Sequence, residues 1–282
     1  MTTGSRDWLV GPVLLFCPGD RPDRFAKAAA VADMVILDLE DGVSAAGKPL
    51  ARQAIRESNL DPSRTIVRVN PCGTSEQEAD RTMLECTSYR NVMVPKFESP
   101  GGLENFSGCS VIALCETPLG VLNAAAIAAS PGASGLMWGA EDLTAALGGA
   151  TSRLAGGRYT DVVRSARSQV LLAAGAYNKP AIDAVYTAFA DLDGLRSEAV
   201  DAAASGFAAK ACVHPKQAMV VRDSFTPTDD QLTWAGEVLR LAPQSRGAFS
   251  LRGQMIDEPL VRQAEAISAR ARTASNLSAV AR

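Results

Sequence analysis

Acidic residues follow several of the short apolar runs in this sequence. Asp38, Glu40 and Asp41 close one such run, Glu116 closes another, and Asp142 follows a third. If these runs are strands of one parallel sheet, the carboxylates converge on a small volume, where they repel one another unless they bind a cation. Magnesium takes one or two protein carboxylates and leaves its other positions to water and substrate. Glu116 and Asp142 are therefore the predicted ligands of a divalent ion.

The three acids of the first run have a supporting role in this interpretation. We expect Asp38, Glu40 and Asp41 to hold metal-bound water or to orient neighbouring groups, including substrate. Taken singly, each acid also fits a solvated loop, and Asp142 fits a helix N-cap because a helical pattern follows it. The grouping of five acids on one predicted rim favours the metal site.

Residues that would support other chemistries are few. His214 is the only histidine, which excludes zinc sites built from two or three histidines. No G-x-S-x-G motif accompanies His214, so we expect it to be structural, in a turn before a helix. Lys96 follows a predicted strand and has the chemistry for a Schiff base, but the surrounding acids would keep its amine protonated.

A second candidate site lies near the N-terminus, where residues 16–22 join an apolar run to a helical pattern. Gly19 permits a tight turn, and the start of the helix offers free backbone N–H groups to an anion such as phosphate. Arg21, Arg24 and Lys27 add positive charge there, although basic residues at this spacing also fit a solvated helix face. No G-x-G-x-x-G or Walker A sequence is present, so neither a Rossmann dinucleotide site nor a P-loop is predicted.

The elements that must position these residues alternate regularly. Eight short β-branched or apolar runs, each followed by a helical pattern, are the predicted strands: 13–17, 34–39, 65–69, 91–94, 111–114, 135–138, 180–183 and 209–213. This alternation predicts an α/β fold of the closed (β/α)8 TIM-barrel type, with a doubly wound open sheet as the alternative.

The pattern changes after the eighth run. Helical patterns cover residues 216–225, 229–241 and 258–273, and the segment 245–257 is rich in glycine and polar residues. We expect a barrel domain over residues 1–222 and a C-terminal helical extension over residues 223–282. The segment 245–257 is either an ordinary surface loop or a lid.

Bulk composition limits the class of protein. The 282 residues include no apolar run long enough to span a membrane, and the charged segment 1–10 is unlike a signal peptide. A net charge of −3 gives no general attraction to nucleic acid or to an anionic membrane. Six scattered cysteines without a C-x-x-C pair indicate reduced thiols. We therefore expect a soluble, cytoplasmic protein without nucleic-acid or membrane partners.

Several of these segments together resemble the citrate lyase β-subunit family, which includes malyl-CoA and citramalyl-CoA lyases. The similar segments lie in order between about residues 10 and 265: 16–22, 37–43, 67–70, 94–96, 116–117, 139–143, 213–217 and 253–259. The resemblance implies a (β/α)8 barrel that depends on magnesium, with manganese as a substitute, and assembles as a homotrimer or hexamer. The implied reaction divides a 3-hydroxyacyl-CoA of the malyl, citramalyl or 3-hydroxy-3-methylglutaryl type into acyl-CoA and a keto acid (pyruvate, glyoxylate, oxaloacetate or acetoacetate).

The same resemblance implies roles for four polar residues. Glu116 and Asp142 match the metal ligands of the family, in agreement with the interpretation of the strand ends. Arg68 matches the arginine that binds the carbonyl oxygen of the keto acid. Asp257 matches a catalytic acid/base that a C-terminal lid donates to the site of a neighbouring protomer. The segment 245–257 is accordingly expected to be a lid.

The resemblance also implies where coenzyme A binds. Phe16, Arg21 and Lys27 match positions that contact the coenzyme, which places it at the second candidate site. Glu40 and Asp41 remain the expected substrate-binding acids beside the metal.

Four other functions remain open from the sequence. The chain could be the β-subunit of a multi-subunit citrate lyase that acts on an acyl-carrier thioester. It could hydrolyse the thioester of malyl-CoA, or it could be a pyruvate aldolase that needs no coenzyme A. A catalytically inactive binding module is the fourth.

Overall fold

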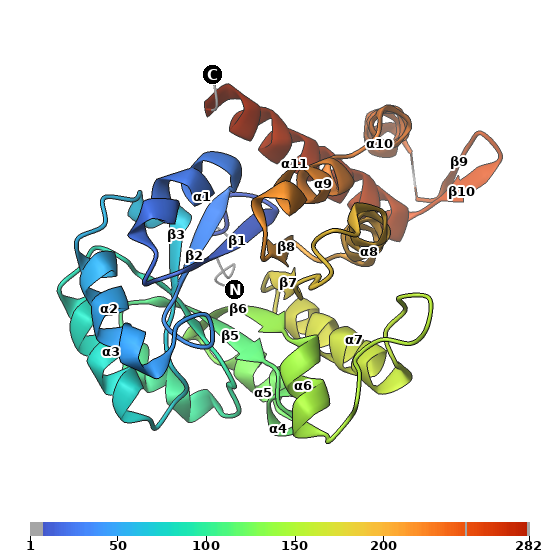
Figure 1. Cartoon of the computed structure of the whole chain (residues 1–282). Helices are drawn as coiled ribbons and strands as arrows, with labels where there is room; N and C mark the ends of the chain where they lie inside the picture. Colours follow the sequence, from blue (N-terminus) through green and yellow to red (C-terminus); the bar gives the residue numbers. More distant parts are fainter. Residues whose placement is uncertain (1–7, 246, 281–282) are drawn as a thin grey trace. The chain divides into compact units, whose positions relative to one another are not determined.

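The computed structural model describes residues 8–245 and 247–280 and divides the chain into two compact units, with the boundary between Val221 and Arg222. Eight parallel strands close into a barrel in the first unit, each paired with its neighbours in sequence and β1 paired with β8 (Figure 1). The strands are β1 (Val13–Pro18), β2 (Met34–Asp38), β3 (Thr65–Arg68), β4 (Asn91–Val94), β5 (Ser110–Cys115), β6 (Ala133–Trp138), β7 (Ala181–Asp183) and β8 (Ala209–Cys212). The predicted closed barrel is confirmed, and the open sheet is excluded.

Helices connect the strands and surround the barrel, as Figure 1 shows. They are α1 (Phe25–Val31), α2 (Lys48–Arg56), α3 (Ser75–Glu85), α4 (Pro118–Leu122), α5 (Ala124–Ala129), α6 (Ala140–Ala146), α7 (Asp161–Ala176), α8 (Leu192–Ser205) and α9 (Pro215–Phe225). Only a 3-10 helix, η4 (Pro100–Phe106), lies between β4 and β5.

A single apolar cluster with members from all eight strands fills the barrel. It includes Leu14 of β1, Ile66 of β3 and Ile182 of β7, each fully buried. Trp8 packs against the same cluster and donates its indole N–H to the Ser134 carbonyl at 3.1 Å. Because the strands are covered by this cluster on one side and by helices on the other, their sequences are apolar throughout rather than alternating.

Two helices differ from the sequence prediction. The helical pattern that follows the fifth apolar run, over residues 119–129, predicts one helix but forms two, α4 and α5, with a break at Asn123. The Asn123 side chain donates to the Glu98 carbonyl at 2.8 Å, and this tether to a neighbouring loop competes with a continuous helix. The last helix, α11 (Glu258–Val280), extends beyond the predicted end at residue 273, and residues 281–282 lie outside the described part.

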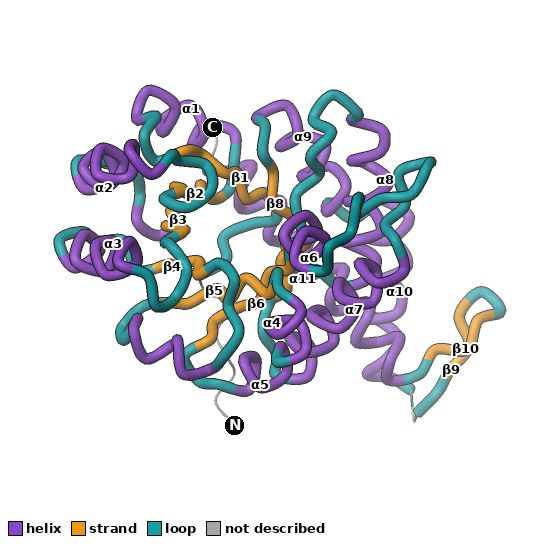
Figure 2. The backbone as a smooth tube through the Cα atoms, turned by 60° about the horizontal axis from the view of Figure 1, so that its bottom comes forward, coloured by secondary structure: helices purple, strands orange, loops and turns teal. Residues whose placement is uncertain are grey.

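The second unit contains α10 (Asp229–Leu241), α11 and a hairpin of β9 (Phe249–Leu251) and β10 (Gln254–Ile256), which Figure 2 shows extending from the helix pair. Arg252 and Gly253 both have positive φ, of 50° and 80°, as a two-residue type I′ hairpin turn requires. Phe249, Leu251 and Ile256 pack with apolar residues of both helices. The sequence pattern does not predict these strands because three residues are too few to show a period of two.

None of the helices in residues 8–245 and 247–280 combines the length and the apolar character that a membrane crossing needs. No disulfide bond joins any two of the six cysteines, all of which lie in the described residues, and Cys17, Cys115 and Cys212 are buried.

Candidate active site

A cavity of about 370 Å³ lies at the carboxyl ends of the barrel strands and brings most of the predicted site residues together. Its polar wall is formed by Asp38, Asp41, Arg68, Glu116, Glu141 and Asp142. Its apolar wall is formed by Phe16, Leu114, Met137, Trp138, Ala184, Val185 and Val213. Residues from β2, β3, β5 and β6 meet here because the loops after parallel strands share one face of a barrel.

Glu116, which directly follows β5, is buried at the base of the polar wall. The backbone N–H of Lys96 donates to Glu116 Oε1 at 3.0 Å. Gly139 makes room for the carboxylate, because a Cβ at that position would lie 2.7 Å from Glu116 Oε2. Burial and the charge of Asp142 raise the pKa of Glu116 to about 8, against the lowering effect of Lys96. A cation in the cavity would relieve this penalty.

Asp142 lies in the first turn of α6, directly after β6. The N-cap residue of α6 is Gly139, so the interpretation of Asp142 as an N-cap is wrong. The side chain of Asp142 is about one-third exposed and faces the cavity. Its charge helps to raise the pKa of Glu116, and both acids contact Lys96, Glu116 through the backbone N–H and Asp142 through the ammonium.

Arg68 at the end of β3 is held firmly by two acids from the end of β2. Its Nε and Nη2 donate to the two carboxylate oxygens of Asp38 at 2.7 and 2.6 Å, and its Nη1 lies 2.9 Å from Glu40 Oε2. The guanidinium also lies 4.9 Å from the centre of the Phe16 ring. Asp38 is itself fixed by the backbone N–H of Gly42 at 2.9 Å, an approach that any side chain at position 42 would block. This arrangement presents a fixed positive charge to the cavity.

Lys96 forms ion pairs with three acids, Glu40, Asp41 and Asp142. Its ammonium contacts Glu40 and lies 3.3 Å from both Asp41 Oδ2 and Asp142 Oδ1. Burial lowers the pKa of Lys96, but Glu40, Glu116 and Asp142 outweigh that effect and raise it above the ordinary lysine value. The amine is therefore protonated, as expected from the acids, and is a poor Schiff-base nucleophile.

These seven residues form one cluster at the cavity, which we call the acidic rim: Asp38, Glu40, Asp41, Arg68, Lys96, Glu116 and Asp142. Oxygen donors of this kind suit a hard divalent ion such as magnesium. Within the part of the chain that the structure describes, no three His, Cys, Asp or Glu side chains are arranged to enclose a metal. Glu116 and Asp142 both line the cavity, and their assignment as the ligands of a magnesium ion stays a prediction.

Four of the predicted site residues do not line this cavity. Glu40 is buried, and its carboxylate lies 2.9 Å from Arg68. Arg21 pairs with Asp23 at 3.0 Å, and Lys27 is exposed on α1. Asp257 follows β10 in the second unit, where it is half-buried. Phe16 alone of the predicted coenzyme contacts lines the cavity. The roles of Arg21, Lys27 and Asp257 stay predictions.

His214 lies in the turn before α9. Its Nδ1 accepts the backbone N–H of Lys216 at 3.2 Å, and its ring stacks on Phe189 with 5.2 Å between ring centres. This arrangement agrees with the expected structural role.

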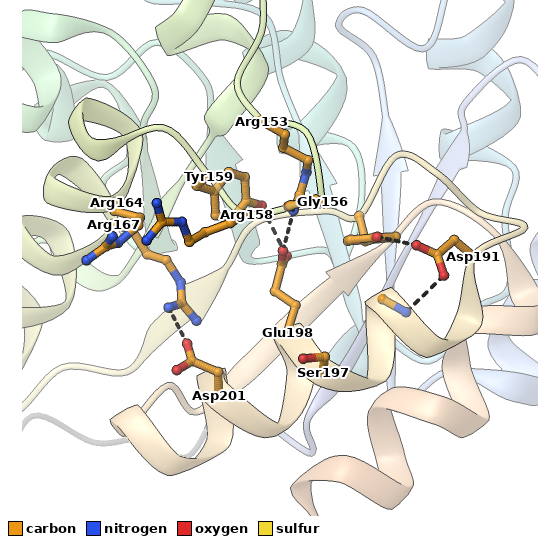
Figure 3. Close-up of a pocket in the computed structure, with 13 residues that line it drawn as sticks. Arg153, Gly156, Arg158, Tyr159, Arg164, Arg167, Asp191, Ser197, Glu198 and Asp201 are labelled. Atoms are coloured by element: carbon orange, nitrogen blue, oxygen red, sulfur yellow. Dashed lines mark hydrogen bonds and ion pairs between the residues drawn. The ribbon is translucent and has the colours of Figure 1, made fainter.

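A second ionic cluster behind β7 and β8 was not predicted. We call it the ion network, and its members are Arg153, Arg167, Asp183, Glu198, Asp201 and Lys210. Lys210 is completely buried and donates to Asp183 at 2.9 Å and to Glu198 at 2.8 Å. Figure 3 shows Arg153 directed at Glu198, and Arg167 paired with Asp201.

A cavity of about 700 Å³, which is larger than the cavity at the acidic rim, is lined by four members of the ion network: Arg153, Arg167, Glu198 and Asp201. Its acids are nevertheless matched by bases: Arg167 also pairs with Asp183 at 2.9 Å, and Trp138 donates its indole N–H to the same carboxylate at 2.8 Å. A fully paired network is a structural arrangement, whereas the acidic rim has an excess of carboxylates. The smaller cavity is therefore the candidate active site.

Comparisons with known proteins found similar sequences and similar structures. The family model described as HpcH/HpaI aldolase/citrate lyase matches residues 13–215. A citrate lyase subunit beta-like protein of Mycobacterium tuberculosis (strain ATCC 25618 / H37Rv) is 51% identical over 266 residues, which cover 94% of this chain and 97% of that protein. The mitochondrial citramalyl-CoA lyase of Mus musculus is 32% identical, with coverage of 90% and 84%. A crystal structure of the M. tuberculosis CitE protein in complex with magnesium, acetoacetate and coenzyme A matches with a TM-score of 0.89 at 51% identity, covering 94% of this chain and 99% of that one.

Proposed function

The chain belongs to the HpcH/HpaI aldolase/citrate lyase family, and from that premise we propose that it is a magnesium-dependent lyase acting on a 3-hydroxyacyl-CoA. The prediction of a lyase is confirmed at the level of the family. The proposed reaction divides a malyl-, citramalyl- or 3-hydroxy-3-methylglutaryl-type thioester into acyl-CoA and a small keto acid, or joins them in reverse. The acetoacetate, magnesium and coenzyme A bound by the similar M. tuberculosis protein support this proposal.

One observation carries the proposal: the guanidinium of Arg68 and the carboxylates of Glu116 and Asp142 line the same cavity. These two carboxylates would hold a magnesium ion, which would act as a Lewis acid toward a carbonyl oxygen of the substrate. Arg68 adds a fixed positive charge on the same oxygen, and its rigid pairing with Asp38 means that little reorganisation is needed during the reaction. Glu40 and Asp41 orient Arg68 and Lys96 beside the substrate.

In the condensation direction, a base removes a proton from the carbon next to the thioester of the acyl-CoA. The resulting enolate attacks the keto carbonyl, a new carbon–carbon bond forms, and the oxygen that becomes negative is stabilised by Arg68 before it is protonated. In the cleavage direction, the same base removes the hydroxyl proton, the carbon–carbon bond breaks, and the enolate of the acyl-CoA takes up a proton. We assign the base to Asp257.

Asp257 belongs to the second unit, so its delivery is a separate part of the proposal. The segment 245–257, with its β9–β10 hairpin, is proposed as a lid that a neighbouring copy of the chain contributes in a trimer or hexamer. Lid closure excludes water and completes the site only with substrate present. Arg21 and Lys27, with Phe16, are the proposed coenzyme A contacts at the barrel mouth.

The decisive experiment incubates the purified full chain and magnesium with malyl-, citramalyl- and 3-hydroxy-3-methylglutaryl-CoA, and measures keto acid and free thiol separately. A lyase releases keto acid without free thiol, whereas a thioesterase releases free thiol without keto acid. Cleavage that appears only when partner subunits and an acyl carrier are added would favour the citrate lyase β-subunit alternative. Absence of product under all of these conditions would overturn the proposal.

The role of Asp257 is tested in the same assay by Asp257→Asn, which we expect to reduce turnover at least ~10³-fold while magnesium affinity stays unchanged, because a general base contributes typically 10²–10⁴-fold. Glu258→Gln is the matched control, since Glu258 is the adjacent acid and pairs only locally with Arg262 at 3.1 Å. Full activity of Asp257→Asn would remove this residue from the mechanism.

A further inference from the structure

Lys96 has an unusual backbone conformation for a residue with a side chain. It follows β4 and Pro95, and its φ is 49°, in the left-handed region that favours glycine. This conformation aims its backbone N–H at Glu116 Oε1, at 3.0 Å. Glycine would hold the same N–H in place with less strain, so the lysine side chain itself must serve a purpose that outweighs the strain.

The side chain of Lys96 extends into the acidic rim, where its ammonium connects acids from two different strand ends. It contacts Glu40, which follows β2, and lies 3.3 Å from Asp142 in α6. The Lys96 side chain is one-third exposed, whereas that of Glu40 is only 4% exposed. The ammonium therefore neutralises a buried acid and at the same time occupies one oxygen of a proposed metal ligand.

We propose that Lys96 is a built-in counter-cation that holds the acidic rim together without metal and weakens the binding of the divalent ion at Glu116 and Asp142. This inference rests on the metal site of the proposed function. The lysine and the metal share the Asp142 carboxylate, and two positive charges at such close range repel each other. Metal loading is consequently an exchange of cations in which Asp142 leaves the ammonium for the metal, and Lys96 sets the affinity.

The direct test is calorimetric titration of the metal-free full chain with magnesium chloride. Lys96→Met removes the charge but keeps most of the apolar stem, and it is expected to bind magnesium about tenfold more tightly, the order of repulsion for charges this close even in a water-like dielectric. Lys96→Arg keeps the charge and should bind no more tightly than the wild type. Lys179→Met, which removes a lysine bonded to the Ser130 carbonyl, is the matched control with no expected change.

Lys96→Gly tests the loss of the charge in a variant whose backbone conformation is retained. Glycine adopts a φ of about 50° readily and retains the N–H that holds Glu116, so this variant remains folded if Lys96→Met does not. It too should bind magnesium about tenfold more tightly. Magnesium affinity that is unchanged or weaker in both Lys96→Met and Lys96→Gly would overturn the inference.

Thermal unfolding gives a second readout that does not depend on activity. Without metal, Lys96→Gly should melt at a lower temperature than the wild type, because the acids of the rim lose their counter-charge. With magnesium in excess, the rise in Tm should be larger in the variant than in the wild type. An equal rise in both proteins would contradict the inference.

These experiments distinguish a failure of the role of Lys96 from a failure of the proposed function. If the wild type binds magnesium and Glu116→Gln does not, but no thioester is cleaved, the proposed function fails while the role of Lys96 stands. If the wild type cleaves a thioester and the Lys96 variants bind magnesium with wild-type affinity, the function stands and the role of Lys96 fails.

Discussion

The acidic rim and the ion network are both buried groups of charges in the same barrel, but their balance differs. The acidic rim contains five carboxylates and two cations, Arg68 and Lys96. The ion network contains three carboxylates and three cations. In the network, burial raises the pKa of Asp183, but Lys210 and Arg167 outweigh it and hold that pKa low. In the rim, burial raises the pKa of Glu116 to about 8.

The ratio of carboxylates to cations distinguishes charges that stabilise the fold from charges that can bind a further cation. A buried carboxylate with full partners is stable as it is, and removing one partner leaves an uncompensated charge. A buried carboxylate with too few neighbouring cations is stabilised only when it binds a proton or a metal ion. The size of the cavity does not make this distinction, since the larger one borders the balanced network.

The largest effect should come from breaking the rim at Glu116. Glu116→Gln keeps the shape of the side chain but removes a metal ligand, so we expect magnesium binding to disappear and the rate of cleavage to fall at least ~10³-fold, the scale of several kcal/mol of lost electrostatic stabilisation. Thermal stability of the metal-free protein should hold below pH 8, where the carboxyl is already neutral, and should rise above pH 8, where the neutral amide replaces a buried charge. Calorimetry measures magnesium binding, and steady-state kinetics measure the rate of cleavage. Retained magnesium affinity would remove Glu116 from the metal site.

A substitution in the ion network should lower the stability of the protein and leave magnesium binding unchanged. Lys210→Met leaves Asp183 and Glu198 without a fully buried partner, so we expect a loss of about 3–5 kcal/mol in the free energy of unfolding. Magnesium affinity of the folded fraction should stay close to the wild type. Urea unfolding followed by circular dichroism provides the measurement. Asp201→Asn, at the exposed edge of the same network, is the control and should cost less than ~1 kcal/mol.

The smallest expected effect is a gradual change of magnesium affinity with pH. Below pH 8 the Glu116 carboxyl keeps its proton in the metal-free protein, and the metal must displace that proton. Apparent magnesium affinity should therefore rise by up to about tenfold per pH unit as pH 8 is approached, and level off above it. Titrations between pH 6 and 9 would detect the change, and a flat profile would contradict a buried Glu116 ligand.

The stability of the metal-free protein should change with the opposite sign. The pKa of Glu116 in the folded state is raised above its ordinary value of 4.5, so its favourable contribution is complete below that value. That contribution is lost as the pH rises through 8. Excess magnesium should remove this dependence.

The sequence was sufficient to predict the barrel and the grouping of the rim acids. Strand ends in a closed parallel sheet must meet on one face, so Asp38, Glu116 and Asp142 could be placed together without a structure. The resemblance to the family, which similarity to known proteins now confirms, added the expected chemistry. Asp257 could not be placed in this way, because it lies in a separate unit, beyond the eight strands.

Other features required the structure because long-range pairing is not visible in one sequence. A signal for the ion network was present, since Lys210 interrupts an apolar run and a charge there must be paired, but nothing indicates that Asp183 and Glu198 are its partners. The ion pairs of Lys96 depend on a left-handed backbone that propensity does not predict for lysine. The break at Asn123 arises from a contact with a distant loop.

The missing side chain at position 139 has a practical consequence for the candidate site. A Cβ there would lie 2.7 Å from Oε2 and 2.8 Å from Cβ of Glu116, so an alanine at this place requires the Glu116 side chain to move. Gly139→Ala is therefore a way to displace the carboxylate without changing any charge.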